Sequence, residues 1–498
     1  MTSNIETIIL TSYFISLCIL FVFGLHGFIM VYHHLKNKEK EDLTFLNLEN
    51  ENNIPTVTIQ LPLYNELYVA SRIIDSTCKI EYPKDKLEIQ VLDDSTDETI
   101  NIVEEQVLHY QKLGFDIKHI RRNSRDGFKA GALKYGLEFA KGEFVAIFDS
   151  DFIPKKEFLL ATIPYFQDEK IGMVQTRWEH LNDEISLLTK AQAMALDGHF
   201  VMEQNVRNKS GYFINFNGTG GVWRKSCIID AGNWEADTIT EDLDLSYRAQ
   251  MKGWKFRFLK NFTSPSELPA EINALKAQQF RWTKGAVEVA HKLLFKVWKS
   301  NTVSLDQKIH STFHLTNNIV FPFILLTGIL NVPIVFIKHQ GAFDNYFAVM
   351  SFFTLSFVGS FMFYFYGQKE IYKDWRKRIL LFPLFMAGSM GFAVSNTKAV
   401  IEGFFKKKSE FVRTPKYNLT NETALERKKK LSQSKYAQKI SLLVIIEFIL
   451  AIYFTIGIAI SIYYVELSAL PFQILFFSGF GFSSFLSIKH FFETKKIK

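Results

Sequence analysis

Long apolar stretches lie on both sides of a more polar central region in this chain. The first runs from about residue 8 to residue 32, and the others follow residue 312. A helix of about 20 apolar residues is long enough to cross the hydrocarbon core of a bilayer. The central region has the composition of an ordinary water-soluble α/β protein. We therefore predict a soluble domain inserted between membrane-spanning helices.

The positions of the basic residues indicate the orientation in the membrane. The segment before the first apolar stretch has no Lys or Arg, whereas the segment after it, HHLKNKEK, is basic. Because basic flanks stay in the cytoplasm, we expect the central domain to be cytoplasmic. The first stretch also lacks a basic leader and a small-residue cleavage site, so we expect a retained anchor rather than a cleaved signal peptide.

Further crossings are predicted from five later apolar stretches, at residues 314–337, 346–366, 379–394, 440–465 and 469–488. If all five crossed, the basic segment 406–439 would lie outside, against the positive-inside rule. The stretch 379–394 is short for a span and contains Pro383 and two glycines. We predict that it lies in the membrane interface or dips in and returns, which leaves one crossing before the central domain and four after it.

An ionisable residue, Glu447, lies inside the apolar stretch 440–465. Such residues are rare in membrane spans and often mark a functional path. Two interpretations stay open: Glu447 faces a protein-lined path, or it snorkels or pairs with a neighbouring side chain.

Charge and cysteine content exclude other classes of protein. The net charge of +7 comes from basic residues beside the apolar stretches, for example in 36–40 and 373–378. A nucleic-acid-binding protein would gather such charge on one face of a soluble domain, so we expect no nucleic-acid partner. The three cysteines, Cys18, Cys78 and Cys227, have no metal-motif spacing, and an odd number argues against a disulfide framework.

Residues 55–265 alternate strand-like and helix-like patterns. Strands are predicted at 56–61, 87–92, 116–120, 143–148 and 173–178. Such alternation predicts a mostly parallel sheet covered by helices on both faces. Ligands of these sheets bind beyond the carboxyl ends of the strands. Three of the predicted strands end in the polar clusters PLYNE, DDSTD and DSD, which indicates one site formed by residues at the ends of three strands.

The DSD cluster places Asp149 and Asp151 one residue apart, directly after a predicted buried strand. Two carboxylates at that spacing can hold a divalent cation and a diphosphate together. The motif alone is weak, because Asp-x-Asp also occurs in solvated turns. Asp93 and Asp94 support it, because a carboxylate at the end of a neighbouring strand could accept hydrogen bonds from a nucleotide base or ribose.

Two later motifs offer a base and a phosphate ligand. In TITEDLDLSYRA, Thr240 could cap a helix that starts near Asp242. Acids are favoured in a first helical turn in any case, but Asp242 could also be a general base for an acceptor hydroxyl. In QQFRW, Gln278, Arg281 and Trp282 share one helix face. Gln278 could bind sugar hydroxyls, Arg281 could bind a diphosphate with two hydrogen bonds, and Trp282 could stack on a sugar ring. Alternatively, the helix could simply lie at the membrane surface.

In their order and separation, the stretches VLDDSTDET, GFKAGAL, VAIFDSDF, FNGTGGVWR, TEDLDLSYRA, KGWKF and QQFRW resemble the processive family 2 glycosyltransferases of the cellulose synthase class. The resemblance covers roughly residues 55–290 and is greatest to plant cellulose synthase-like mannan and glucan synthases, with bacterial cellulose synthase also similar. It implies a GT-A fold, a UDP-glucose or GDP-mannose donor, and Mg²⁺ or Mn²⁺ as cofactor.

The same resemblance implies roles for individual residues. Asp242 would be the catalytic base, and Asp149 and Asp151 would hold the metal. The donor nucleotide and its diphosphate would be bound by Pro62, Tyr64, Glu66, Asp93, Asp94, Lys129, Asp149 and Arg281. The acceptor would be bound by Asn217, Glu241, Gln278 and Trp282.

A further match is FVRTPK, at residues 411–416, which follows the predicted interfacial segment. It resembles the gating loop that covers the donor in bacterial cellulose synthases, except that an arginine here separates the Val–Thr pair of that pattern. The resemblance implies loop contacts from Phe411, Arg413, Thr414 and Lys416. A solvated basic loop is the alternative, but closure of an active site by a loop is a common device and favours the gating interpretation.

We therefore expect an α/β GT-A domain inserted between transmembrane helices, with about five crossings plus interfacial helices. The expected parts are an anchor (1–35), a cytoplasmic GT-A domain (36–305) and a membrane region (306–498), the last with an interfacial segment 379–402 and a loop 403–438.

The predicted activity is inverting polymerisation of a β-linked glucan or mannan at the plasma or inner membrane. The product would leave through a channel formed by the membrane helices, and membrane lipids are a further expected partner. Addition of a single sugar to ceramide or diacylglycerol is the alternative, because enzymes of that kind share the D, D, D and R/Q-x-x-R-W pattern. A non-enzymatic scaffold is disfavoured, because every catalytic residue type is present.

Overall fold

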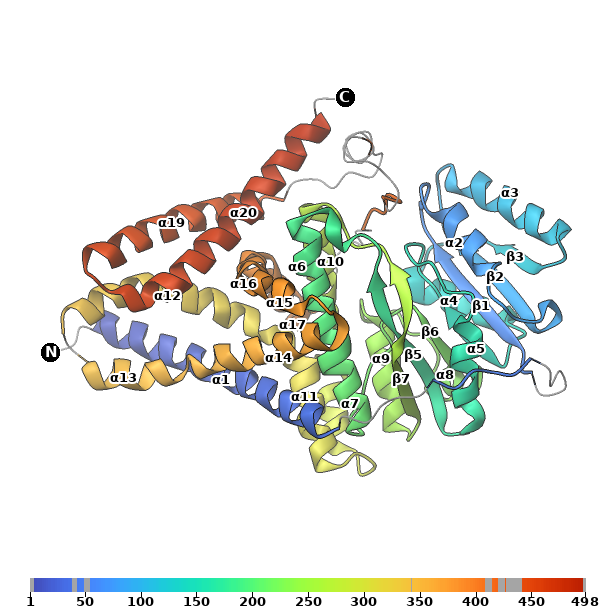
Figure 1. Ribbon diagram of the computed structural model, residues 1–498, viewed down its shortest axis with the longest axis horizontal. Helices are drawn as coiled ribbons and strands as arrows, with labels where there is room; N and C mark the ends of the chain where they lie inside the picture. Colours follow the sequence, from blue (N-terminus) through green and yellow to red (C-terminus); the bar gives the residue numbers. More distant parts are fainter. Residues whose placement is uncertain are drawn as a thin grey trace.

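The computed structural model describes residues 4–37, 43–48, 54–341, 343–407, 414–419, 426 and 441–495. The chain has two parts, a bundle of long helices and an α/β domain beside one end of it (Figure 1). Helix α10 (Ile272–Lys299) joins them, because it contacts α9 (Glu241–Met251) of the domain as well as α17 (Ala393–Phe404) and α20 (Leu470–Lys495) of the bundle.

The sheet has seven strands in the order β3-β2-β1-β4-β6-β5-β7. Their bounds are β1 (Val57–Leu63), β2 (Leu87–Asp93), β3 (Asp116–Ile120), β4 (Phe144–Ile147), β5 (Ile171–His180), β6 (Gly221–Arg224) and β7 (Lys255–Ser266). β3, β2, β1 and β4 are parallel, β6 runs antiparallel between β4 and β5, and β7 is parallel to β5. The mostly parallel sheet and its five predicted strands are confirmed.

Sequence patterns did not predict β6 and β7. β6 has only four residues and begins at a glycine, so its extended form depends on its two antiparallel neighbours. β7 is interrupted by charged residues and Pro265, and its pairing with β5 shifts register twice.

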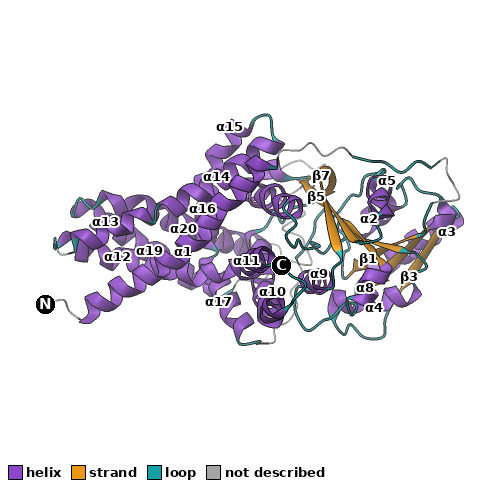
Figure 2. Cartoon of the chain, turned by 90° about the horizontal axis from the view of Figure 1, so that it is seen from below, coloured by secondary structure: helices purple, strands orange, loops and turns teal. Residues whose placement is uncertain are grey.

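Helices cover both faces of the sheet, as predicted (Figure 2). One face is covered by α2 (Ala70–Thr77), α3 (Thr99–Lys112) and α5 (Phe158–Thr162), and the other by α4 (Phe128–Phe139), α8 (Lys225–Asp230) and α9. β4 shows the alternation that produces two cores. Phe144 and Ala146 join the first core, whereas Val145 and Ile147 join the second, because successive side chains of a strand point to opposite faces.

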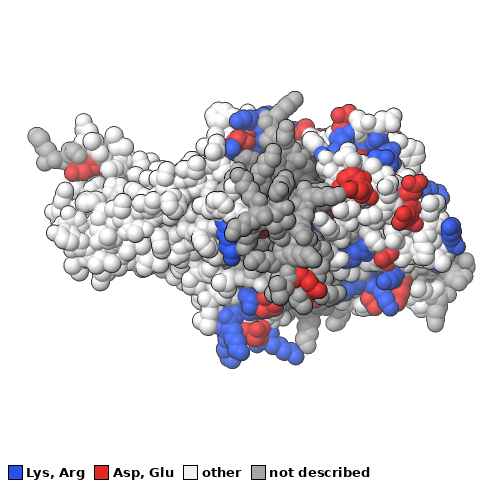
Figure 3. Space-filling model, turned by 90° about the horizontal axis from the view of Figure 1, so that it is seen from above, with Lys and Arg blue, Asp and Glu red and all other residues white. Residues whose placement is uncertain are grey.

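Within the described ranges, five helical segments are long and apolar enough to cross a membrane. They are Asn4–Lys36 (α1), Leu305–His339 (with α11, Leu305–Thr316, and α12, Val320–His339), Asp344–Ile371 (with α13, Asp344–Phe352, and α14, Leu355–Ile371), Leu443–Tyr463 (α19) and Leu467–Phe492 (most of α20). The visible face of the bundle carries almost no charged residue, whereas charges gather over the α/β domain (Figure 3). The chain is a multi-pass membrane protein.

A bent pair of helices follows α14. Trp375–Gly391, which includes α15 (Trp375–Arg378) and α16 (Phe382–Gly391), meets α17 at an angle of 47°. Such a pair is either a broken span or a segment that enters the membrane and returns. The interfacial placement of 379–402 therefore stays a prediction, as do the boundaries between the three predicted parts.

A second continuous helix lies between the domain and the bundle. α6 (Leu187–Asp197) passes through a π-helical turn, Gly198–Gln204, into α7 (Asn205–Lys209). Ser186 caps α6 by accepting the backbone N–H of Thr189 at 3.1 Å. The π-turn contacts β5 and β7 on one side and α14 on the other, so its side chains reach the boundary between the two parts.

Glu447 is paired with a lysine of the domain-bundle connection. It is fully buried in α19, and its Oε2 lies 2.6 Å from Nζ of Lys276 in α10. Ser483 of α20 donates to the same carboxylate oxygen at 3.1 Å, and Lys276 also donates to Ser487 at 3.0 Å. Of the two interpretations left open by the sequence, pairing with a neighbour is the one observed.

Candidate active site

A cavity of about 220 Å³ lies at the carboxyl ends of β1, β2 and β4, as the three polar strand ends predicted. It brings together most of the predicted site residues, namely Pro62, Tyr64, Glu66, Asp94, Lys129, Asp149, Asp151, Asn217, Glu241, Asp242, Gln278, Arg281, Trp282, Thr414 and Lys416. Asp93 does not line it, and Phe411 and Arg413 lie outside the described residues. We call this space the donor cavity.

The adjacent residues Asp93 and Asp94 have different surroundings. Asp93 is buried, its Oδ2 lies 2.9 Å from His119 Nε2, and its Oδ1 accepts the backbone N–H of Ser95 at 2.9 Å. Burial alone would raise the pKa of Asp93, but these hydrogen bonds lower it. Asp94 lines the cavity and accepts from Nε of Arg122 at 3.0 Å. Asp94 thus lies in the cavity wall, while Asp93 holds β2 to β3.

Each carboxylate of the DSD motif contacts a lysine. Nζ of Lys129 in α4 donates to Asp149 Oδ1 at 2.6 Å and to the carbonyl of Gly218 at 2.8 Å. The ammonium of Lys416 contacts Asp151. The two aspartates could hold Mg²⁺ or Mn²⁺, because carboxylate oxygens are ligands that these hard cations prefer, and Lys416 shows that a cation fits beside Asp151.

Asp242 and Glu241 begin α9 on another wall of the cavity. Burial raises the pKa of both carboxyls, and the ammonium of Lys129 opposes that rise. Oδ1 of Asp242 also accepts the backbone N–H of Leu243 at 2.8 Å. A carboxylate with a raised pKa takes up a proton more readily, which is what a general base must do.

The predicted hydrogen-bonded cap by Thr240 is wrong. Thr240 occupies the N-cap position of α9, but its hydroxyl makes no capping hydrogen bond. Instead it packs against α10 at Gly285, where an added Cβ would come within 2.4 Å of Thr240 Cγ2. The close approach of α10 therefore determines the environment of this side chain.

The FNGTG loop lies against both Asp242 and the DSD motif. Gly218 has a φ of +79°, and an added Cβ would lie 3.0 Å from Asp242 Oδ2 and 3.4 Å from Lys129 Nζ. The next residue, Thr219, accepts the backbone N–H of Asp149 through Oγ1 at 2.9 Å. Only glycine allows both this backbone conformation and this close approach.

A second cavity, of about 430 Å³, extends from Asp242 into the helical bundle, and we call it the bundle cavity. Asn217, Asp242, Gln278 and Trp282 line both cavities. The walls inside the bundle come mainly from α14, α16 and α20, with the aromatic residues Tyr364, Phe385 and Phe482, and Phe392 lines the cavity between α16 and α17. Aromatic side chains thus form part of the wall of the bundle cavity.

Of the predicted gating motif, residues 411–416, the structure describes 414–416, and Thr414 and Lys416 line the donor cavity. Arg281 Nη2 donates to Thr414 Oγ1 at 2.9 Å, and burial lowers the pKa of Arg281 to about 10, so it stays charged. The described residues that follow, 417–419, are anchored to two carboxylates. Tyr417 donates to Glu271 at 3.0 Å, and Glu267 accepts the backbone N–H of Leu419 at 2.9 Å.

Several residues of the two cavities were missed by sequence reasoning. The guanidinium of Arg125 lies 3.3 Å from the ring centroid of Tyr64, and both line the donor cavity. Arg125 follows β3, so the strand-end signal that found DDSTD could also have found it. Trp178 lines both cavities, and His199 and Glu203 line the bundle cavity. Nothing in their spacing marked these three.

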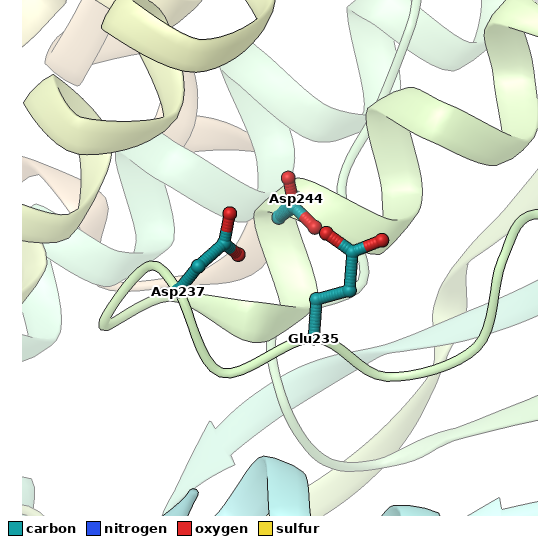
Figure 4. Close-up of side chains that lie close together, drawn as sticks. All are labelled: Glu235, Asp237 and Asp244. Carbon is teal, nitrogen blue, oxygen red and sulfur yellow. The ribbon is translucent and has the colours of Figure 1, made fainter.

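One group of three carboxylates among the described residues could suggest a separate metal site. Oxygen atoms of Glu235, Asp237 and Asp244 lie within 4.8 Å of one another, on α9 and the loop before it (Figure 4). However, Nζ of Lys292 lies 2.6, 2.8 and 2.9 Å from these three side chains, respectively. Lys292 and the guanidinium of Arg248, which pairs with Glu235 and Asp244, already offset most of this negative charge, so we assign the group a structural role.

Taken together, the mostly parallel α/β sheet and the cavity at the carboxyl ends of its strands are those of a GT-A fold. Residues 55–285 match the protein-family model described as "Glycosyltransferase like family 2", a range that contains every cavity residue named above from the α/β domain and the start of α10. Residues 55–285 of this chain are thus similar to family 2 glycosyltransferases.

Two similar plant proteins show the extent of the match. The chain is 43% identical over 277 residues to "Probable glucomannan 4-beta-mannosyltransferase 7" of Oryza sativa subsp. japonica, which covers 54% of this chain and 47% of that protein. It is 39% identical over 303 residues to "Glucomannan 4-beta-mannosyltransferase 9" of Arabidopsis thaliana, which covers 58% and 57%. The chain thus matches about half the length of these relatives.

A solved structure supports the fold. The mannosyltransferase PcManGT from Pyrobaculum calidifontis, in complex with GDP-Man and Mn²⁺, superposes with a TM-score of 0.55 at 17% identity. The match covers 80% of this chain and 100% of that one. At this identity the likeness concerns the fold.

Proposed function

We propose that this protein is a membrane-embedded, inverting mannosyltransferase that builds a β-linked mannan or glucomannan from GDP-mannose. The observation that carries the proposal is that the donor cavity and the bundle cavity share Asp242, Asn217, Gln278 and Trp282. A donor at the strand ends would thus face an acceptor in the bundle. The identity of 39–43% to plant proteins named as glucomannan mannosyltransferases supports mannose as the sugar.

In this mechanism the nucleotide lies near Tyr64 and Asp94, and its diphosphate lies near the DSD motif. Arg281, Lys129 and Lys416 supply positive charge that offsets the charge developing on the leaving group. A divalent cation held by Asp149 and Asp151 would add Lewis-acid neutralisation of the same group.

Asp242 accepts the proton of the acceptor hydroxyl as that oxygen forms a bond to C1 of mannose. The bond between C1 and the diphosphate oxygen breaks on the opposite side, and GDP leaves with its electron pair. One displacement inverts the configuration, so an α-linked donor gives a β-linked product. The raised pKa of Asp242 supports its role as the proton acceptor.

The product would then move into the bundle cavity, whose aromatic walls are suited to successive sugar rings. We propose that the catalytic domain is cytoplasmic, as the basic flanks of the apolar segments indicate. Residues 414–419 would act as part of a loop that closes over the donor, because Thr414 bonds to Arg281 and Lys416 contacts Asp151.

The test is to give the purified full chain, in detergent, radiolabelled GDP-mannose or UDP-glucose with Mn²⁺ or Mg²⁺. Label from GDP-mannose in an ethanol-insoluble product that endo-β-1,4-mannanase degrades is the expected result. Label recovered only in an organic-extractable lipid would instead mean single-sugar transfer to a lipid. Incorporation from UDP-glucose alone would contradict mannose as the sugar.

A further inference from the structure

We infer that His199 and Glu203 fix the side chain of Asn217 so that its amide nitrogen is presented to the acceptor sugar. This depends on the proposed function, because it concerns the acceptor of that reaction. All three residues line the bundle cavity, and Asn217 also lines the donor cavity beside Asp242. His199 and Glu203 are therefore positioning residues that act through Asn217.

The π-turn Gly198–Gln204 supplies three of the side chains involved. His199 and Glu203 are four residues apart in it, and His199 Nδ1 lies 2.9 Å from Glu203 Oε2. Their side chains are 28% and 21% exposed, and both line the cavity. π-helical turns within α-helices are often found at functional sites, because the wider turn moves side chains off the ordinary helical face.

The orientation of the Asn217 amide follows from hydrogen bonds that begin at a backbone carbonyl. The carbonyl oxygen of Asn215 can only accept, so the atom of Gln204 that lies 2.9 Å from it is the amide nitrogen. The same nitrogen donates to Asn215 Oδ1 at 2.8 Å. Asn215 Nδ2 is then left to donate to Asn217 Oδ1 at 3.0 Å. Asn217 thus turns its oxygen toward Asn215.

His199 makes the second bond to that oxygen. Its Nε2 lies 2.9 Å from Asn217 Oδ1, while its Nδ1 faces the carboxylate of Glu203. Both partners are acceptors, so both ring nitrogens must carry a proton and His199 is an imidazolium. Burial alone would lower the pKa of His199, but the hydrogen bond and the charge of Glu203 raise it above its ordinary value of 6.5.

Other charged and titratable groups surround the pair. The guanidinium of the fully buried Arg207 opposes protonation of His199, but it also helps to lower the pKa of Glu203, against the effect of burial. His314 Nε2 lies 3.8 Å from Glu203 Oε1. The charged and titratable groups that interact with the pair are Arg207 of α7, Tyr247 of α9, His314 of α11, Tyr364 of α14 and His26 of α1. Asp242 of α9 lines the same cavity.

The consequence concerns the acceptor hydroxyl. With two donors on Asn217 Oδ1, its N–H groups are what the side chain offers to a ligand, and one of them makes only a long contact of 3.4 Å to the Asn215 carbonyl. A sugar hydroxyl that gives its proton to Asp242 still has lone pairs that accept. An N–H from Asn217 therefore complements the carboxylate of Asp242 at the acceptor.

The test measures the KM for a β-manno-oligosaccharide acceptor and for GDP-mannose, from about pH 6 to about pH 9, in the full-length protein. Only the protonated form of His199 can donate to both Glu203 and Asn217 and so fix the Asn217 side chain. Its effect is thus present at low pH and lost as the pH rises through the His199 pKa, where the acceptor KM of the wild type should increase. Asp242 ionises in the opposite sense with a pKa of about 6, so its effect on turnover falls at the acid end of this range.

Three variants separate the roles. His199→Gln should raise the acceptor KM about tenfold at low pH, the size expected for one charge-assisted hydrogen bond, and abolish its pH inflection while the donor KM stays within about twofold. Glu203→Gln should move the inflection to lower pH, because the partner charge is gone. His109→Gln, an exposed histidine on α3, should match the wild type.

The inference would be overturned if His199→Gln kept the acceptor KM and the pH profile of the wild type. It would also be overturned if the inflection in Glu203→Gln stayed at the pH of the wild type. An equal rise of donor and acceptor KM would also overturn it, because that indicates general distortion of the site. Absence of any mannose transfer by the wild type would instead contradict the proposed function. The two failures are thus distinguishable.

Discussion

Lys276 of α10 and Glu447 of α19 form a buried ion pair between the helix that joins the two parts of the protein and the membrane bundle, with Nζ and Oε2 2.6 Å apart. Lys276 lies two residues before Gln278, so the pair connects α19 to the part of α10 that carries Gln278, Arg281 and Trp282. Because Glu447 is fully buried, water cannot replace either partner of the pair. Removing one charge would therefore leave the other buried and uncompensated, which costs unfolding free energy.

Breaking this pair should destabilise the protein. Glu447→Gln leaves the Lys276 ammonium buried without its counter-charge, and we expect a loss of about 3 kcal/mol of unfolding free energy, seen as a lower Tm in detergent. The double variant Lys276→Met, Glu447→Gln should recover much of that loss. An unchanged Tm in Glu447→Gln would show that the pair contributes nothing to the junction.

Gly218 should be essential for turnover because of its contact with Asp242. In Gly218→Ala, the new Cβ would press on Asp242 and Lys129, so we expect kcat to fall at least about tenfold. Gly211→Ala is the matched control, because Gly211 has a similar φ of +74° but nothing within 4 Å of an added Cβ. Both variants should lose about 1 kcal/mol from backbone strain. Equal activity in the two variants would refute the steric role.

Activity should fall on the acid side of neutrality. Burial raises the pKa of Asp242 to about 6, and the base must be unprotonated to accept the acceptor's proton. The value of kcat/KM should therefore be low below about pH 6 and rise with pH through that value. The measurement is the pH profile of mannose transfer at fixed metal concentration. An acid limb near the ordinary aspartate pKa, about 4, would contradict the assignment.

Lys416 should compete with the metal at Asp151. Lys416→Met removes the ammonium that contacts Asp151, so half-maximal activity should need less Mn²⁺. The same change should raise the KM for GDP-mannose several-fold, by about 1 kcal/mol, because a charge near the diphosphate is lost. A Mn²⁺ titration and a donor titration measure the two effects. If the Mn²⁺ requirement rose instead, the competition would be refuted.

The strand ends were predictable because period-two apolar runs followed by polar clusters mark buried strands directly. The donor-cavity residues followed from that pattern and from the resemblance of the motifs. β6 was not predictable, because its four residues are extended only through pairing with β4 and β5. The choice of Asp94 over Asp93 depends on His119 of β3, which is a contact between strands.

Two other features depend on tertiary structure in the same way. The Thr240 hydroxyl makes no cap because α10 packs against it at Gly285. His199 and Glu203 have an i,i+4 spacing that ordinary helices share, and only the π-turn and the nearby FNGTG loop bring them to Asn217. Periodicity reports which face is apolar, but it does not report which distant segment will pack there.

The most direct measurement compares the wild type with Asp242→Asn, using labelled GDP-mannose and mannanase digestion of the insoluble product. The wild type should make mannanase-sensitive polymer. Asp242→Asn should lose transfer by at least about 100-fold while still binding GDP-mannose, because the variant lacks only the base. Polymer made by Asp242→Asn at a rate near that of the wild type, or no mannose incorporation by the wild type, would contradict the account.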